Sequence, residues 1–292
     1  MIPLTSETLE ITTTQLLAEK QSQIDTLPTF SAQSSKAKTL WKGKKGSNAG
    51  QTAFSEIKDK LIEMSVGVEI CNYCENNEAT DIEHIFPKDW FPNKTFIWEN
   101  YLLACRTCNT DYKSNRFAIF VPKHTNNILD VIAQPPNDDS AFINPQIEDP
   151  LDFFLLNLKR GVFTIHPNLT NHPQSRAYIK ADYTLELLAL NTRDALVNAR
   201  KSAVKYYLDR LERYTKIKAT TTAETLEIAI DPIEEIIDNV SFNTEKARFL
   251  TAVKQEIKNY AHPTVWSELK RQRINLARTN RLFQQAPEAL NW

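Results

Sequence analysis

The chain has 292 residues, of which 41% are hydrophobic and 10% are aromatic, so it can bury a core and does not have the composition of a disordered chain. The formal net charge of −1 hides local bias: residues 36–60 carry seven lysines against two acids, residues 219–240 carry six acids and no base, and residues 268–281 carry five Lys/Arg against one Glu. No apolar run approaches the roughly 18 residues of a membrane-spanning helix, and the N-terminus lacks a secretory signal pattern, so we expect a cytoplasmic protein without a membrane segment.

The N-terminal part is predicted to contain two helices joined by a basic loop. Hydrophobic spacing predicts helices over residues 7–23 and 53–64. Between them, residues 36–52 contain three of the five glycines of the chain and several lysines, which is typical of a loop. The scarcity of glycine elsewhere leaves few tight turns and favours helices over a many-stranded sheet.

Prolines dominate the middle of the chain. Four prolines between residues 135 and 150 exclude a long helix and indicate a linker or an extended segment that wraps around the core. After them, residues 161–167 are predicted to form a short strand.

The C-terminal part is predicted to be helical. Its apolar spacing begins near residue 185, and Asn191 and Thr192 are typical of the N-cap of a long helix over residues 193–216. Further helices are predicted over residues 223–230, 232–239, 244–260 and 265–283.

The four cysteines form two C-x-x-C pairs with thirty residues between them: Cys71 with Cys74, and Cys105 with Cys108. In a cytoplasmic chain this pattern indicates a metal site rather than disulfides. Four thiolates complete a tetrahedral zinc shell and leave no open position, so we expect a structural Zn²⁺ that stabilises the fold and does not take part in catalysis.

The residues between and beside these pairs form a specific constellation. It consists of Cys71-x-x-Cys74, Glu83-His84 with Pro87-Lys88, Trp98-Glu99-Asn100, and Cys105-x-x-Cys108-Asn109 with Lys113. In order and spacing it resembles the HNH endonuclease family, which has a ββα-metal fold, in the version with two zinc-binding C-x-x-C pairs.

The resemblance implies a role for each residue of the reactive site. His84 would be the general base, and Glu83 and Asn109 would bind a catalytic Mg²⁺ or Mn²⁺, for which carboxylate and amide oxygens are suitable ligands. Residues 81–85 are predicted to form a strand, on which Glu83 and His84 point to opposite sides. Asn100 would hold the loop between two strands and so orient His84.

The same resemblance gives Lys88 and Lys113 as candidate phosphate contacts, although a solvated helix position is an equal alternative for Lys113. Two residues depart from the commonest family pattern. Glu83 stands where Asp is usual, and Asn109 stands where many members carry His. Asp81 lies on the same strand face as Glu83 and could share the metal.

Short markers further along the chain extend the resemblance. They are Ile143-Asn144-Pro145, Glu148-Asp149-Pro150, Gly161, Leu188-x-Leu190-Asn191 and Leu196-x-x-x-Arg200. This succession is similar to the HNH nuclease subunits of Septu-type and retron-associated anti-phage systems (PtuB-like proteins). The similarity implies a defence nuclease beside an ABC-type ATPase partner. The helices after residue 181 and the acidic residues 219–240 could then be a docking surface, or they could simply pack on one another.

The basic residues Lys42, Lys44 and Lys45, with Trp41 beside them, fit nucleic-acid contact by charge and stacking. The alternative is a solvated, mobile loop. The remaining histidines have no companions of this kind and are expected to be structural: His124, His166, His172 and His262.

Taken together, the sequence predicts a mainly α (α+β) protein with a small ββα-metal core. The expected divisions are an N-terminal helical segment (1–67), the HNH nuclease core (68–125), a proline-rich linker or wrap (126–180) and a helical C-terminal region (181–292). The predicted function is metal-dependent hydrolysis of phosphodiester bonds, with DNA as the expected nucleic acid. The alternatives are a catalytically weak, zinc-stabilised adaptor that binds nucleic acid or protein, and a stand-alone restriction-type nuclease.

Overall fold

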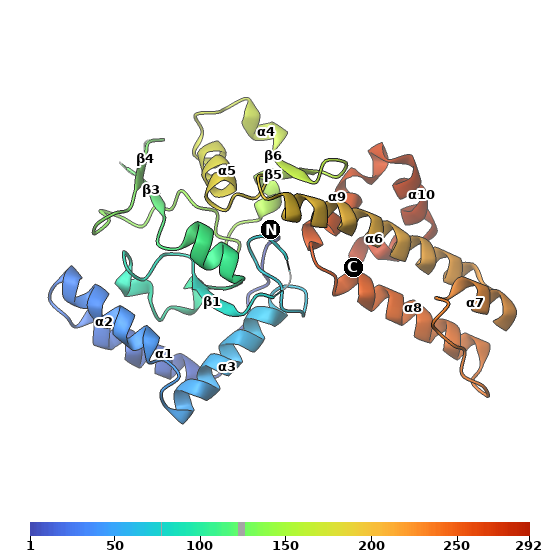
Figure 1. Ribbon diagram of the computed structural model, residues 1–292, viewed down its shortest axis with the longest axis horizontal. Helices are drawn as coiled ribbons and strands as arrows, with labels where there is room; N and C mark the ends of the chain where they lie inside the picture. The colour runs from blue at the N-terminus through green and yellow to red at the C-terminus, as the bar shows by residue number, and fades with distance from the viewer. Residues whose placement is uncertain (77, 122–125) are drawn as a thin grey trace.

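The computed structural model describes residues 1–76, 78–121 and 126–292, and it is mainly α-helical with small strand pairs (Figure 1). His124, and the predicted division after residue 125, lie outside the described residues. In the described part of the chain, six strands form three separate two-stranded antiparallel sheets: β1 (Asp81–His84) with β2 (Tyr101–Ala104), β3 (Ala118–Phe120) with β4 (Ile128–Asp130), and β5 (Phe154–Asn157) with β6 (Val162–Ile165). No helix of these residues is long and apolar enough to cross a membrane.

Three N-terminal helices pack beside the first strand pair, drawn in blue in Figure 1: α1 (Ile11–Asp25), α2 (Phe30–Lys42) and α3 (Asn48–Glu63). The predicted loop over residues 36–52 is therefore wrong except at residues 43–47. Thr29 caps α2 by accepting a hydrogen bond from the amide of Ala32, and Ser47 caps α3 in the same way at Gly50. Gly50 also has to be glycine, because a Cβ there would lie 2.2 Å from the oxygen of Lys44.

The centre of the molecule has the predicted ββα arrangement. β1 pairs with β2 in a register that places His84 opposite Tyr101, and a helix of π type, η3 (Thr107–Lys113), follows β2. Two single 3₁₀ turns, η1 (Pro92–Lys94) and η2 (Trp98–Asn100), lie in the loop between the strands.

The second half of the molecule is built on α6 (Asp194–Ala219), which runs from the centre of Figure 1 to its right side. It contacts α8 (Phe242–Lys258), α9 (Pro263–Gln272), α10 (Ala277–Gln285) and α7 (Ala223–Ala229). The shorter helices α4 (Pro167–Thr170) and α5 (Arg176–Leu187) precede it, and the 3₁₀ turns η4 (Pro150–Asp152), η5 (Arg273–Asn275) and η6 (Pro287–Asn291) complete the description.

Two of the helices predicted in this half are wrong. Residues 232–239 are not helical, because the chain is held by side chains of the neighbouring helices as it passes from α7 to α8. The helix predicted over residues 265–283 is divided into α9 and α10, because Leu276 adopts an extended conformation between them. The strand predicted over residues 161–167 is present as β6.

Three of the five resemblance markers, which contain Gly161, Asn191 and Arg200, meet at one buried place. Asn191 both donates to and accepts from the backbone of Phe163, and Arg200 donates to the oxygens of Gly161 and Leu190. Gly161 has a φ of 69°, and a Cβ there would lie 2.5 Å from the oxygen of Val197 in α6. These markers therefore fix the β5–β6 hairpin to the long helix.

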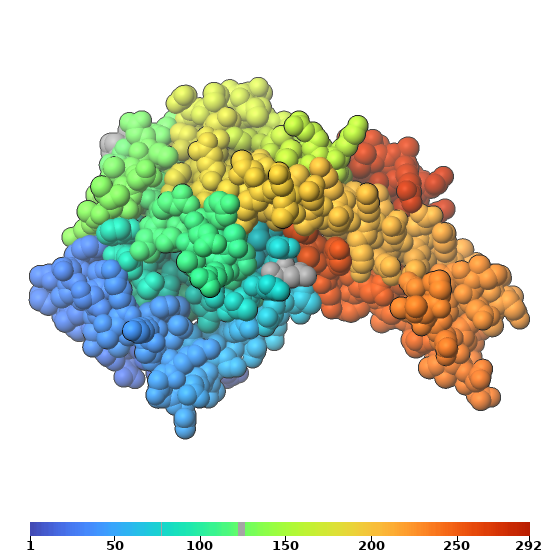
Figure 2. Space-filling view, in the orientation of Figure 1, coloured from blue at the N-terminus to red at the C-terminus, as the bar shows by residue number. Residues whose placement is uncertain are grey.

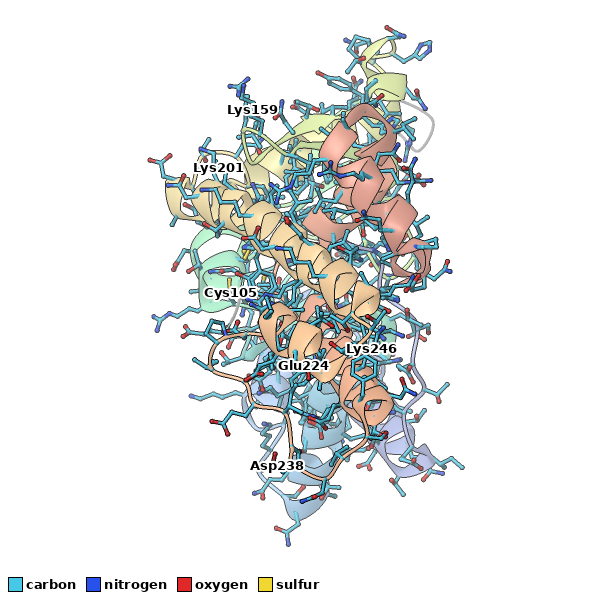
Figure 3. All side chains as sticks on the ribbon, turned by 90° about the vertical axis from the view of Figure 1, so that its right-hand side faces the viewer. Cys105, Lys159, Lys201, Glu224, Asp238 and Lys246 are labelled. Atoms are coloured by element: carbon cyan, nitrogen blue, oxygen red, sulfur yellow. The ribbon has the colours of Figure 1, made fainter. Side chains whose placement is uncertain are left out.

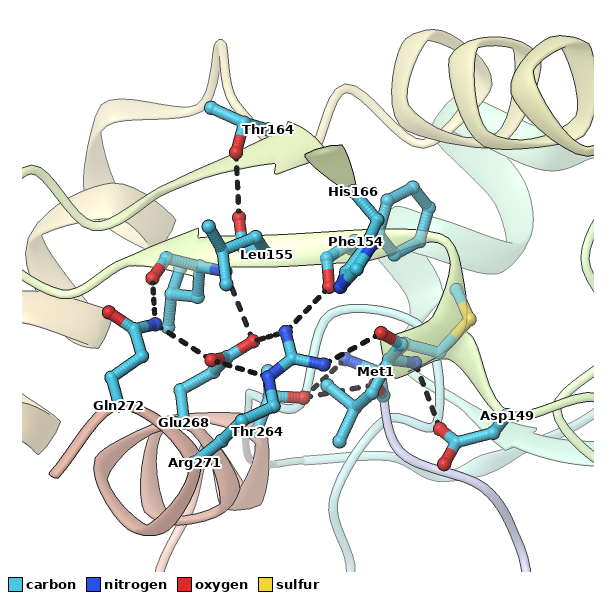
Figure 4. Close-up of polar contacts among 12 residues, drawn as sticks. Met1, Asp149, Phe154, Leu155, Thr164, His166, Thr264, Glu268, Arg271 and Gln272 are labelled. Carbon is cyan, nitrogen blue, oxygen red and sulfur yellow. Dashed lines mark hydrogen bonds and ion pairs between the residues drawn. The ribbon is translucent and has the colours of Figure 1, made fainter. Parts of the chain in front are cut away.

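A second polar cluster fixes α9 to β5 (Figure 4). The carboxylate of Glu268 is fully buried and accepts hydrogen bonds from the amide of Leu156 and from the side chains of Arg271 and Gln272. Arg271 also donates to the backbone oxygens of Leu151 and Phe154. A buried carboxylate is stable when it is paired and hydrogen-bonded in this way.

Candidate metal centre and active site

The four cysteines converge as predicted. Their Sγ atoms lie within 4.8 Å of one another, at the turn before β1 and at the start of η3. Cys74 and Cys105 have their sulfurs 3.8 Å apart, which is nearly twice the length of a disulfide bond. Four thiols at this separation fit a tetrahedral Zn²⁺ shell without an open position.

Two contacts fix the cysteine turns. The side-chain oxygen of Asn72 accepts a hydrogen bond from the backbone N–H of Leu103 in β2. The backbone N–H of Asn72 donates in turn to the backbone oxygen of Leu103, and each bond is 2.8 Å long. At the other pair, both Nη atoms of Arg193 lie 3.5 Å from Cys108 Sγ. Arg193 is the N-cap residue of α6, so the long C-terminal helix begins directly on the cysteine cluster.

His84 is held by one hydrogen bond that determines its tautomer. Its Nε2 atom lies 2.9 Å from the backbone oxygen of Thr95. A carbonyl oxygen can only accept, so Nε2 carries the proton and Nδ1 keeps the lone pair in the neutral ring. Among the described residues, Nδ1 has no hydrogen-bond partner, so it is the nitrogen of His84 that can accept a proton.

Aromatic side chains enclose the His84 ring. The ring centroid of Trp41, from α2, lies 4.1 Å away, and that of Tyr101 lies 5.4 Å away; His84 is only 4% exposed. Burial and the charges of Lys88, Lys113 and Lys44 lower the pKa of His84 to about 3, although the bond to Thr95 opposes this shift. The ring is therefore neutral near pH 7, and Nδ1 keeps its lone pair.

Asn100 fixes the loop that carries Thr95. Its side-chain oxygen accepts from the amide of Phe86 at 2.7 Å, and its nitrogen donates to the oxygens of Phe86 and Lys94. The loop is thereby closed across its base. Since the Thr95 oxygen binds His84, this geometry links Asn100 to the orientation of the imidazole.

Glu83 forms a buried ion pair with Lys113. The Lys113 Nζ atom lies 2.7 Å from Glu83 Oε1 and 2.8 Å from the oxygen of His84, and Lys113 is fully buried. Burial raises the pKa of Glu83 and lowers that of Lys113, and the opposite charge of the partner offsets part of each shift. In this arrangement the ammonium group occupies the position of a cation beside Glu83, and Lys113 is not available to contact a phosphate.

Asp81 and Asn109 form the next pair along the same two elements. The Asn109 amide nitrogen donates to Asp81 Oδ2 at 2.9 Å. The amide oxygen of Asn109 and Asp81 Oδ1, which accepts only a long bond of 3.3 Å from the exposed Thr80 hydroxyl, are two oxygen atoms suited to a hard cation. The structure therefore places Asn109 beside Asp81, and it gives Glu83 a different partner.

The comparisons with known proteins agree with this geometry. The family model described as HNH endonuclease matches residues 71–115. Residues 71–115 are an HNH endonuclease domain. The chain also resembles the Septu protein PtuB of Bacillus thuringiensis, with 27% identity over 149 residues that cover 49% of this chain and 44% of that protein. The match thus spans less than half of PtuB. No solved structure is significantly similar to the chain.

Basic side chains border the HNH domain on the side of His84. Lys44 stacks on the Trp41 ring at 4.3 Å, and its pKa is lowered by burial and by the nearby charges of Lys45 and Lys88. Lys42 and Lys45 are exposed at the end of α2 and just beyond it. Trp41 itself packs inward on His84, so it is not a free stacking platform as the sequence suggested.

Two residues that contact the cysteines or the candidate base were not predicted from the sequence. Arg193 lies 85 positions beyond Cys108, and the backbone of Thr95 carries no side-chain signal at all. The basic charge of Arg193 at the start of a predicted helix was visible, but nothing local in the sequence indicates a contact with the cysteines.

Proposed function

We propose that the chain is a metal-dependent HNH endonuclease that hydrolyses phosphodiester bonds in DNA. The observation that carries this proposal is the bond from His84 Nε2 to the Thr95 oxygen, which leaves Nδ1 as a neutral, unpartnered base within the HNH domain. A purely structural role would not explain why the ring is oriented so that Nδ1 is left without a hydrogen-bond partner.

In the proposed reaction, His84 Nδ1 takes the proton from a water molecule, whose oxygen attacks the phosphorus as the bond to the leaving 3′-oxygen breaks. General-base action of this kind typically contributes roughly 10²–10⁴-fold to the rate. Thr95 holds the ring in the productive tautomer, and Asn100 holds the loop of Thr95. Lys44, Lys45 and Lys88 would attract the phosphate backbone, with Lys42 on the approach.

A divalent cation, Mg²⁺ or Mn²⁺, would stabilise the charge on the phosphate and on the leaving oxygen. Asp81 Oδ1, which also accepts from the Thr80 hydroxyl at 3.3 Å, and the amide oxygen of Asn109 fit such a cation, with water and phosphate oxygens completing its shell. Glu83 would bind the same cation as Asp81 and Asn109 only after its ion pair with Lys113 had opened.

We propose further that the protein acts in a bacterial anti-phage defence system, in the cytoplasm, with an ABC-type ATPase as partner. The similarity to the Septu protein PtuB supports this proposal over about half of each chain. A stand-alone restriction-type nuclease is the alternative. Co-purification with an ATPase encoded beside the gene would separate the two.

One observation favours a second candidate function, a zinc-stabilised adaptor that binds nucleic acid or protein without cleaving it. Lys113 neutralises Glu83, so the carboxylate next to the candidate base is already satisfied without a metal. An adaptor would bind DNA and would not nick it with any divalent ion.

The test is a cleavage assay on supercoiled plasmid, single-stranded DNA and tRNA with Mg²⁺ or Mn²⁺. Wild type should cut at least one DNA substrate, and His84→Ala should lose cleavage while its zinc content is unchanged. His172→Ala, which removes an exposed histidine, is the matched control and should cut at the wild-type rate. Equal cleavage by wild type and His84→Ala would contradict the proposed mechanism, and DNA binding without nicking would favour the adaptor.

A further inference from the structure

Residues 223–240, which we call the acidic isoleucine segment, combine exposed isoleucines with a high density of acidic residues. Ile228 is 86% exposed, Ile233 is 90% exposed and Ile237 is 53% exposed. The same residues contain six acids and no Lys or Arg: Glu224, Glu227, Asp231, Glu234, Glu235 and Asp238.

This segment lies at the end of the molecule opposite the N-terminal helices. It comprises α7 and its connection to α8, which project at the lower right of the space-filling view (Figure 2). When that side is turned toward the viewer, Glu224 near the start of α7 and Asp238 shortly before α8 mark the two ends of the segment (Figure 3). The segment therefore lies away from the HNH domain and its basic side chains.

Specific contacts fix the segment in this outward-facing conformation. Asp231 pairs with Arg213 of α6 at 2.6 Å. The amide of Ile237 donates to Glu245 Oε2 of α8 at 3.0 Å, and Arg248 donates to the oxygen of Glu235 at 2.9 Å.

Two apolar residues add to these polar contacts. Leu226 and Ile230 are buried beneath the segment, while Ile228 between them points to solvent. The isoleucines are thus exposed on a backbone that is held in place, which reduces the entropy that binding would cost.

The charge of the segment selects among partners. Asp231 is paired with Arg213, but the other five carboxylates have no ion-pair partner among the described residues, and they would repel nucleic acid and anionic lipid surfaces. A second copy that presented the same segment would be repelled as well. An apolar surface bordered by Lys and Arg would bury the isoleucines and pair with the acids.

We propose that the acidic isoleucine segment is the docking site for a partner protein whose surface is apolar at its centre and basic at its border. This inference rests on the proposed function, because the partner that we assign to it is the ATPase subunit. Burying exposed isoleucines contributes most of the affinity, and the acids mainly speed association.

The test uses the full zinc-loaded chain and the purified ATPase encoded beside its gene. Ile228→Asp combined with Ile233→Asp should weaken binding by about tenfold or more. Ile274→Asp, at a 72% exposed isoleucine in η5, is the matched control and should bind like wild type. Glu224→Lys combined with Glu227→Lys should slow association and flatten its dependence on salt.

The outcomes separate the docking inference from the proposed function. Equal affinity of wild type and the Ile228/Ile233 variant for the ATPase would overturn the docking site and leave the partnership intact. A failure of wild type to bind would overturn both. Loss of a wild-type dimer in the variant, measured by light scattering, would overturn the assignment to a different protein. DNA cleavage by the isolated variant should equal that of wild type in every case.

Discussion

Lys113 Nζ lies 2.7 Å from Glu83 Oε1 inside the HNH domain, and neither side chain has appreciable contact with solvent. The net contribution of a buried ion pair to stability is small, but the removal of one partner is costly because the other charge is left buried and unpaired. The pair joins the end of η3 to β1, the strand that carries His84, so its integrity affects the position of the candidate base.

Lys113→Met should therefore destabilise the protein by about 3–5 kcal/mol, because it leaves the Glu83 carboxylate buried without a partner. The double variant Glu83→Gln with Lys113→Met should recover part of this loss, since both charges are removed. Urea unfolding of the zinc-loaded proteins measures the difference. If the double variant is destabilised by the sum of the two single effects, the two side chains are not coupled.

The metal ligands give a second prediction. If the oxygens of Asp81 and Asn109 bind the catalytic cation, Asp81→Ala should raise the Mg²⁺ concentration for half-maximal cleavage by about 10–100-fold. Asp111→Ala, which removes an exposed carboxylate from the same helix as Asn109, should leave that concentration unchanged. A cleavage titration with Mg²⁺ checks both. Identical curves for the two variants would show that Asp81 does not bind the cation.

The sequence was most informative where function depends on residues close together in the chain. The C-x-x-C spacing predicted the cysteine cluster, and residues 81–85 were predicted as a strand that the structure contains as β1. The Glu83–Lys113 pair joins positions thirty residues apart, and no local pattern indicates that the lysine side chain turns inward. The helix α2 was missed because the glycines and lysines that follow it suggested a loop that begins too early.

Contacts between residues far apart in the chain could not be predicted either, because no local sequence pattern indicates them. The contact between Arg193 and Cys108 depends on how α6 packs against the HNH domain, which periodicity within each element does not specify. The burial of His84 beneath Trp41 likewise depends on the placement of α2. The residue types were visible, while their partners were set by tertiary packing.

The contact of Arg193 with Cys108 leads to a prediction about zinc. Arginine N–H groups beside a cysteine sulfur stabilise the thiolate form that binds the metal. Arg193→Ala should lower zinc affinity by about tenfold or more, measured by competition with a chromophoric chelator. Arg160→Ala, at an exposed arginine in the β5–β6 turn, is the control. Equal zinc affinities in the two variants would show that the Arg193 side chain does not stabilise the zinc site.

Trp41 covers His84, and its removal should open the site. Trp41→Ala should accelerate modification of His84 by diethylpyrocarbonate, detected by mass spectrometry, because the indole ring no longer shields the imidazole. It should also lower the free energy of unfolding by about 3–5 kcal/mol, since the indole packs on Phe54, Phe96 and Tyr101 as well. Trp90→Ala, at a tryptophan whose indole donates to the oxygen of Asn115, should leave the modification rate of His84 unchanged. An unaltered rate in Trp41→Ala would show that another group shields the ring.

His262 gives a prediction about acid stability. It lies buried between Glu75, Arg200 and the amino group of Met1, and neither of its ring nitrogens has a hydrogen-bond partner among the described residues. Burial lowers its pKa to about 4, against 6.5 in the unfolded chain, although the charge of Glu75 opposes the shift.

Between these two values the unfolded chain binds more protons at this position than the folded protein does. Stability is therefore complete above pH 6.5 and falls as the pH drops toward 4, by up to about 3 kcal/mol. His262→Asn removes the titration and suits the left-handed backbone at this position, where φ is 61°. Urea midpoints of wild type and His262→Asn should diverge between pH 6.5 and 4, with the variant losing less. Acid loss of zinc affects both proteins alike, so the difference between them isolates His262. Parallel curves would show that His262 becomes protonated as readily in the folded protein as in the unfolded chain.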